Sequence, residues 1–384
     1  MEGGGVIAEG GYGCIYHPEL LNDGTENKNM NYVSKLQIYN DAAKREINIG
    51  KKVEKIDNYM KFFSPIISYS LIENNKVRKN KLLKECKNTH IQSKIKTNDN
   101  DLILMKMYYI DGESFYYFII NRDNSSYIIN NIINSYNHLL KGFDLLIKNK
   151  ICHFDIKGDN ILFDKNLLLP LIIDFGLSID ITSLKESNLK NYFYIHYAKY
   201  YIWPLEIHYL TFLLHKNKEP SKEELHNIAF TYTENNRGLK YFSNNFKKKY
   251  YKSCMSQLHY YNNLNYSKRL NKLLGFWKTW DNYAMSIMYL SLIHNIYNKG
   301  YEDNKFLVFF IELLLQNIHP NPIKRLSVSE TYKTFNSFLL NKKINNIKTF
   351  EELKKMFFKN KKNINENLTK DKTIIQYLTR QISK

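Results

Sequence analysis

The chain has 384 residues, 43% of them hydrophobic, which is enough to bury a sizeable core and to form two or three domains or one large domain with two lobes. No run of about eighteen uncharged apolar residues occurs, and residues 1–13 lack the basic and apolar regions of a signal peptide. We therefore expect a soluble, cytoplasmic protein without a membrane span. The formal net charge of +19 would favour acidic proteins or nucleic acid as partners. However, the lysines are interleaved with Asn and Tyr along the chain, as codon bias in an AT-rich genome would produce, so we interpret the charge mainly as a compositional effect.

Cysteine usage argues for free thiols. Cys14, Cys86, Cys152 and Cys254 are scattered and form no Cys-x-x-Cys pair. This spacing suggests neither a zinc site nor a disulfide framework, so we expect reduced thiols, as in an intracellular compartment.

The first part of the chain has the pattern of short strands and one helix. Residues 4–16 predict a strand, a glycine-rich turn and a second strand, and residues 31–39 predict a third strand. Apolar residues on one side of residues 41–56 predict a helix. The Lys- and Asn-rich composition of residues 73–100 predicts a polar, mobile surface loop. Strand character returns at residues 101–112.

From Ser125 onward the pattern is mainly helical. Apolar residues recur at helical spacing up to Leu146, which predicts a long buried helix. The helix leads into HFDIKGDNILFD (153–164), where polar residues stand between apolar runs and are expected to point into a shared cleft. The runs NILF and LLLPLIIDFG predict paired strands, and the chain after residue 206 is almost wholly helical in pattern. Ser221, in the capping box SKEE, predicts a helix start.

Three polar signals near the amino terminus are weak when taken singly. Gly10 and Gly13 in EGGYGCIY would let a hairpin backbone approach phosphates, although an ordinary glycine turn has the same pattern. Lys35 interrupts a strand-like run, as an edge-strand lysine also would. Glu46, on the following helix, could hold that ammonium toward the α and β phosphates of a nucleotide, or could simply face solvent.

Two motifs farther along carry a stronger signal. Asp155, Lys157 and Asn160 form D-x-K-x-x-N, whose groups can orient a hydroxyl, neutralise a γ phosphate and ligate a metal. Asp174 in IIDFG follows an apolar run and offers a second carboxylate for Mg²⁺. Together these residues favour phosphoryl transfer over a purely structural role.

In this order, the motifs resemble those of the protein kinase family: a glycine-rich loop, a strand lysine, a helix glutamate, H-R-D-x-K-x-x-N and D-F-G. Three downstream segments extend the resemblance over roughly residues 6 to 340. IWPLE resembles the A-P-E signature, WDNYAMS the D-x-W-x-x-G helix, and HPNPIKRLSV the segment whose arginine pairs with the A-P-E glutamate. The resemblance implies a buried ion pair of Glu206 with Arg325 and a backbone anchor at Asp281.

The resemblance implies an α+β, bilobal protein-kinase-like fold with a small β-rich amino lobe and a larger, mainly helical carboxyl lobe. The lobes would cover residues 1–110 and 111–340, and residues 341–384 would form a basic helical tail. Residues 215–272 look like an insertion, because Glu206 and Asp281 lie much farther apart than the roughly fifteen positions of the family pattern. Since this insertion shows little apolar periodicity, we expect it to contribute little to the core, to be dispensable for catalysis and to matter for partners.

The same resemblance assigns roles to individual residues. Asp155 and Lys157 would be catalytic, and Asn160 and Asp174 would ligate Mg²⁺ or Mn²⁺. Met107 falls at the gatekeeper position, followed by a hinge at 108–110 whose backbone would bind adenine. The residues implied to bind ATP are Ala8, Gly10, Gly13, Ile15, Lys35, Glu46, Met107 and Tyr109.

Lysine two positions after the catalytic aspartate is typical of serine/threonine kinases, so we expect a kinase that acts on serine and threonine hydroxyls of protein substrates. We further expect a monomer. WPLE, a compact amino lobe near residue 1 and the AT-biased composition most resemble kinases of large cytoplasmic DNA viruses, which would place the protein in host cytoplasm and leave open whether virions also contain it. Two alternatives stay open: a pseudokinase scaffold that binds nucleotide or partners, and a small-molecule kinase of related fold. Binding of nucleic acid could accompany any of these.

Four departures from the family pattern bear on these expectations. Ala8 replaces the first loop glycine, Ser286 replaces another glycine, and Phe154 replaces the H-R-D arginine. Gly50 stands where kinases usually place a bulky residue, which predicts loose packing behind Glu46. Phe154 offers neither a charge nor a hydrogen-bond donor to a phosphate on the activation segment. We therefore expect activity that does not depend on phosphorylation of that segment.

Overall fold

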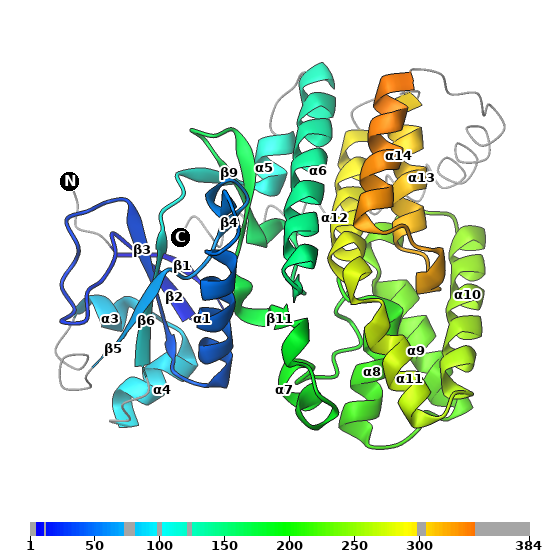
Figure 1. The fold of residues 1–384 in the computed structure, drawn as a ribbon, viewed down its shortest axis with the longest axis horizontal. Helices are drawn as coiled ribbons and strands as arrows, with labels where there is room; N and C mark the ends of the chain where they lie inside the picture. The colour runs from blue at the N-terminus through cyan, green and yellow to red at the C-terminus, as the bar shows by residue number, and fades with distance from the viewer. Residues whose placement is uncertain are drawn as a thin grey trace. The chain divides into compact units, whose positions relative to one another are not determined.

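The computed structural model divides into two compact units, one ending at Asn188 and the other beginning at Leu189. Every strand among the described residues lies in the first unit, and the second unit is helical there (Figure 1). The α+β class predicted from the sequence is therefore correct. The expected lobe boundary after residue 110 and the roles of the lobes stay predictions. The structure describes residues 5–10, 13–72, 81–97, 102–120, 125–297 and 305–341.

An antiparallel five-stranded sheet in the order β1-β2-β3-β6-β5 forms the start of the first unit. Helix α1 (Asp41–Val53) follows β3. Asn40 caps its amino terminus, where the Asn40 side chain accepts a hydrogen bond from the amide of Ala43. The register places Lys35 of β3 opposite Met105 of β6. The strands are β1 (Gly5–Glu9), β2 (Gly13–His17), β3 (Tyr32–Ile38), β5 (Ser68–Leu71) and β6 (Leu102–Tyr108).

A second sheet in the first unit positions the polar stretch at 153–164. Its order is β4-β10-β9-β7, and β9 pairs antiparallel with β10, as the two apolar runs predicted. A short pair, β8 with β11, and the helices α5 and α6 complete this part. The bounds are β4 (Phe63–Ser64), β7 (Gly112–Ser114), α5 (Phe115–Ile120), α6 (Ser125–Lys148), β8 (Ile151–Cys152), β9 (Ile161–Asp164), β10 (Leu169–Ile173) and β11 (Ile179–Asp180).

Residues 81–97 correct two expectations from the sequence. Where a polar loop was expected, the chain forms α3 (Lys81–Glu85) and α4 (Thr89–Thr97), with Leu83 and Ile91 buried. Cys86, between these helices, forms a disulfide with Cys14 of β2, whereas all thiols were expected to be reduced. The spacing of the cysteines did not reveal this pair because the two residues, 72 positions apart, meet only when the sheet forms. The remaining residues of the expected loop, 73–80 and 98–100, lie outside the described residues.

The second unit is built from helices, several of which come from the expected insertion at 215–272. Ser221 begins α9 with both hydrogen bonds of a capping box, as predicted. Helices α12, α13 and α14 follow the insertion and pack in sequence (Figure 1). The bounds are α7 (Leu189–Tyr192), α8 (Leu205–Lys216), α9 (Lys222–Asn235), α10 (Asn244–Asn262), α11 (Tyr266–Gly275), α12 (Trp280–Tyr297), α13 (Lys305–Asn317) and α14 (Val328–Asn341).

The expectation that the insertion contributes little to the core is wrong. Its helices bury apolar side chains, and they join the rest of the unit through tyrosine hydroxyls. The hydroxyl of Tyr232 on α9 lies 2.7 Å from that of Tyr283 on α12. Tyr250 on α10 donates to the carbonyl of Ile318 at 2.6 Å. The composition concealed this core because tyrosine is polar at its tip and apolar along its ring.

Residues 342–384, which include most of the expected basic helical tail, lie outside the described residues. None of the helices described in the structure is both long and apolar enough to cross a membrane.

We predict that Tyr232→Phe lowers the free energy of unfolding by about 1–3 kcal/mol, because the buried hydroxyls of Tyr250 and Tyr283 each lose one hydrogen bond and keep those with Ile318 and Asn236. Tyr260→Phe, at a tyrosine that is 43% exposed, is the matched control and should change little. Denaturant unfolding of both variants makes the comparison. Equal stability of the two variants would show that the tyrosine network does not hold the insertion to the unit.

Candidate active site

A buried ammonium group lies between two carboxylates in the first unit. Lys35 Nζ on β3 contacts both carboxylate oxygens of Glu46 on α1, at 2.8 and 2.9 Å. It also contacts Oδ1 of Asp174, just after β10, at 3.0 Å. The side chains of Lys35 and Glu46 are 8% and 2% exposed, whereas that of Asp174 is 37% exposed. Asp174 therefore presents the open side of the group.

The electrostatics keep the Lys35 and Asp174 groups charged. Burial alone would lower the pKa of Lys35, but the charges of Glu46 and Asp174 raise it well above the usual lysine value. Burial would likewise raise the pKa of Asp174, but the Lys35 ammonium lowers it below the usual range. A permanent cation with a permanent anion at its open side suits the binding of phosphates together with a metal ion.

The polar stretch at 153–164 holds a second carboxylate in place. Asp155 is 4% exposed, and its Oδ2 accepts hydrogen bonds from Lys157 Nζ and Asn160 Nδ2, both at 2.9 Å. Asn160 also donates to the carbonyl of Asp155. The ring of His153 lies 3.0 Å from the carbonyl oxygen of Ile173, which joins this loop to the residue before Asp174. The amide nitrogen of Asn160 is thus committed to Asp155, which leaves its oxygen for a cation.

All the residues proposed from the sequence to act at the site line one cavity of about 570 Å³. A cavity of this size can hold a small organic ligand. Val33 and Ser64 also line it and were missed. The period of two along β3 could have revealed Val33, whereas Ser64 lies on a two-residue strand without a sequence pattern. The predicted residues around the cavity are Ala8, Gly10, Gly13, Ile15, Lys35, Glu46, Met107, Tyr109, Asp155, Lys157, Asn160 and Asp174.

The second unit contains the predicted buried ion pair. Arg325 contacts Glu206 through two parallel bonds of 2.7 and 2.9 Å, and neither side chain is exposed. Trp280 Nε1 donates to the same carboxylate at 3.2 Å. Asp281 is buried, and its role as a backbone anchor stays a prediction.

The protein kinase domain, the family that this geometry indicates, aligns with residues 4–358, which is most of the chain. The chain belongs to the protein kinase family. A stretch of 90 residues is in addition 28% identical to a protein of Mycoplasma genitalium that carries the name "Putative serine/threonine-protein kinase". That stretch covers 23% of this chain and 23% of the relative, so the match spans less than a quarter of the relative's length.

In the segment expected to form the hinge, one backbone group already has a partner within the protein. The amide of Tyr109 donates to the carbonyl of Asn31 at 2.8 Å, and its ring stacks on His17. The Tyr109 amide is therefore engaged within the protein, and adenine would have to use other backbone groups of residues 108–110.

Helix α1 is also tied to the segment that follows Asp174. Lys52 on α1 forms an ion pair with Asp180 of β11. The other oxygen of Asp180 accepts the hydroxyl of Thr182 at 2.7 Å. Burial would raise the pKa of Asp180, but the bonds from Lys52 and its neighbours lower it. The group that contacts α1 here is thus the carboxylate of Asp180, and not a phosphate added to the segment after Asp174.

The packing of α1 at Gly50 is close, which corrects the expectation of loose packing behind Glu46. Gly50 is buried, and a Cβ placed there would overlap the carbonyl oxygen of Ile66. The absence of a side chain lets the helix backbone approach the residues before β5. The glycine therefore sets the distance of the helix that carries Glu46.

We predict that Gly50→Ala lowers the free energy of unfolding by about 1–3 kcal/mol, because the added methyl group forces α1 away from Ile66. The matched control is Gly142→Ala in α6, where a Cβ would meet its nearest neighbours at an ordinary 3.5 Å. That change should be neutral or stabilising by up to about 1 kcal/mol. Denaturant unfolding checks both, and equal effects of the two alanines would contradict the close approach.

Proposed function

We propose that the protein is a serine/threonine protein kinase, which transfers the γ phosphate of ATP to serine and threonine hydroxyls of protein substrates. One observation carries the proposal: Asp155 and the triad of Lys35, Glu46 and Asp174 line the same cavity. Phosphoryl transfer requires positioned phosphates and a group that orients the attacking hydroxyl, and the cavity offers groups suited to both.

Each role in the proposal follows from the chemistry of a side chain. Lys35 would bind the α and β phosphates, and Lys157 would neutralise the γ phosphate. Asp155 would orient the substrate hydroxyl and accept its proton. Asn160 and Asp174 would hold Mg²⁺ or Mn²⁺, since both can present the oxygen ligands that such cations prefer. When bound, that cation would neutralise charge on the phosphates.

The finer assignments rest on sequence features. Lys157, two positions after Asp155, supports serine/threonine specificity. WPLE at 203–206 and the AT-biased composition support a relationship with kinases of large cytoplasmic DNA viruses. On this basis we infer a location in host cytoplasm and leave open whether virions also contain the protein. We further propose a monomer, and the positive charge of the chain would allow contacts with acidic proteins or nucleic acid.

Two alternatives differ from this proposal in what they require of the site. A pseudokinase scaffold would not need Asp155 to be held by both Lys157 and Asn160, yet both contacts are present at 2.9 Å. A small-molecule kinase would not need the Glu206–Arg325 pair that resembles protein kinases. Both observations favour a protein kinase.

We predict that Asp155→Asn lowers turnover by at least about 100-fold with little change in ATP affinity, because Asp155 acts on the hydroxyl and not on the nucleotide. Asp174→Asn should instead weaken binding of Mg·ATP. The measurements are nucleotide affinity by calorimetry and turnover on a mixed peptide library. Equal loss of affinity in the two variants would refute the assigned roles, and labelled products without serine or threonine would refute the substrate class.

We also predict that activity does not depend on phosphorylation between Asp174 and Glu206. Phe154, at the position of the usual phosphate-binding arginine, is buried and apolar, and the Lys52–Asp180 pair already contacts α1. Turnover should change by less than about threefold after phosphatase treatment, and also in Ser187→Ala, which removes an exposed acceptor. A loss of about tenfold or more in either sample would contradict the prediction. Ser187 suits this test better than Thr182 or Ser183, whose hydroxyls bind Asp180.

A further inference from the structure

Three consecutive residues between α3 and α4 bind the hairpin formed by β1 and β2. Cys86 is joined to Cys14 by the disulfide. The amide of Lys87 donates to Oε1 of Glu9 at 3.0 Å. Asn88 Nδ2 donates to the carbonyl of Gly10 at 2.9 Å. We call residues 86–88 the tether.

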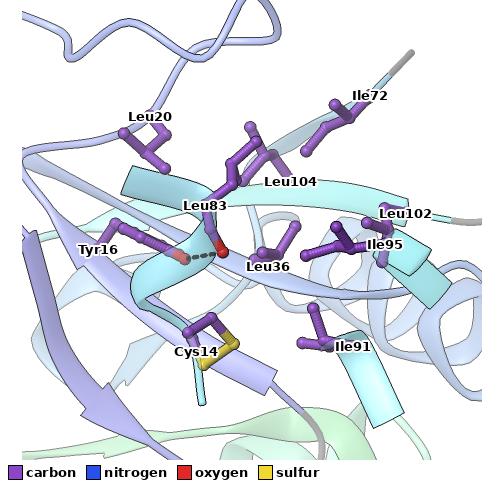
Figure 2. Close-up of a cluster of buried hydrophobic side chains, with 11 residues drawn as sticks. Cys14, Tyr16, Leu20, Leu36, Ile72, Leu83, Ile91, Ile95, Leu102 and Leu104 are labelled. Carbon is purple, nitrogen blue, oxygen red and sulfur yellow. Dashed lines mark hydrogen bonds between the residues drawn. A yellow bond between two sulfur atoms is a disulfide. The ribbon is translucent and has the colours of Figure 1, made fainter. Parts of the chain in front are cut away.

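The tether is anchored in the core of the first unit. Leu83 of α3 and Ile91 and Ile95 of α4 pack in one buried cluster with Leu36 and Leu104 of the central strands, as Figure 2 shows. The hydroxyl of Tyr16 on β2 donates to the carbonyl of Leu83 at 3.4 Å (Figure 2). The helices on both sides of the tether are therefore fixed to the sheet, so its bonds can restrain the hairpin.

Two hydrogen bonds hold the backbone of Gly10. Its amide donates to the carbonyl of Gly13 at 2.9 Å, and its carbonyl accepts from Asn88. A Cβ placed on Gly10 would meet no atom of the described residues within 4 Å. The bond from Asn88 therefore links the backbone of Gly10 directly to the tether, beside the contacts that Cys86 and Lys87 make with the neighbouring strands.

Asn88 serves two structures with two different atoms. Its Oδ1 accepts from the amides of His90 and Ile91 at 3.1 and 3.2 Å, as a capping side chain does at the start of a helix. Its Nδ2 binds Gly10. A substitution that keeps the acceptor and removes the donor can thus separate the two roles.

We propose that the tether positions the glycine-rich hairpin over the nucleotide, with Asn88 as the positioning residue. This inference rests on the proposed kinase function, because Gly10 and Gly13 line the cavity assigned to ATP. A hairpin already held in place loses less conformational freedom when it closes on phosphates. The tether therefore contributes to nucleotide affinity and not to the chemical step.

The test uses two substitutions of Asn88 in the full chain. Asn88→Ser keeps a residue suited to cap α4 but is too short to reach Gly10, and Asn88→Asp keeps the acceptor and lacks the donor. For both we expect roughly fivefold or greater loss of affinity for Mg²⁺ with a non-hydrolysable ATP analogue, as for one lost hydrogen bond. The KM for ATP should rise similarly, while kcat changes by less than about twofold.

Asn265→Ser is the matched control, because Asn265 caps α11 in the second unit and binds the amide of Lys268 at 3.0 Å. It should leave nucleotide affinity unchanged. Cys86→Ala, which removes the disulfide, is a second probe of the tether if the Asn88 variants do not fold, and it should also raise the KM for ATP more than it lowers kcat.

The outcomes separate the inference from the function on which it rests. Absence of analogue binding to the unsubstituted protein would overturn the proposed function. Binding by that protein with unchanged affinity in Asn88→Asp would overturn the inference alone, since the donor would then be dispensable. A fall in kcat at constant KM, or an equal loss of affinity in Asn265→Ser, would also overturn it.

Discussion

The first unit depends on the ion pairs that the buried Lys35 ammonium forms with Glu46 and Asp174. Removal of a charged group from water is costly, and loss of one partner from a buried pair typically costs about 3–5 kcal/mol. The three residues come from β3, from α1 and from the turn after β10, so these elements must meet for the charge to be compensated. The geometry of the site and the folding of the unit are for this reason coupled.

Helix α1 is fixed at three positions within about two turns. Glu46 binds Lys35, Gly50 lets the backbone approach Ile66, and Lys52 binds Asp180. The first and third contacts are ion pairs, and the second is close packing of the backbone. Together they hold the helix against the sheet and against the segment after Asp174. We therefore expect that this helix needs no further phosphate to orient it, in line with the apolar side chain of Phe154.

The grouping of the charged residues was easier to predict than their surroundings. Lys35, Glu46, Asp155 and Asp174 were singled out because their motifs occur in the order of the protein kinase pattern, and in the structure they line one cavity. The disulfide and the two helices at 81–97 could not, since Cys14 and Cys86 meet only through the sheet register and the helices contain few apolar residues. Gly50 was misread because its effect depends on the backbone of Ile66, which no local pattern reveals.

The insertion was misread for a chemical reason that applies to the whole chain. Among 384 residues there are 31 tyrosines, and several provide core volume that aliphatic residues would otherwise supply. A buried tyrosine hydroxyl needs a hydrogen-bond partner. The packing of a tyrosine-rich core therefore depends on the direction of these hydrogen bonds as well as on the volume of the side chains. The bonds of Tyr232 with Tyr283, and of Tyr209 with Asn262 at 2.8 Å, meet that requirement between helices. In a search for hydrophobic periodicity, tyrosine counts as only partly apolar. Such a search therefore underestimates the size of a core whose specificity comes from hydroxyl groups.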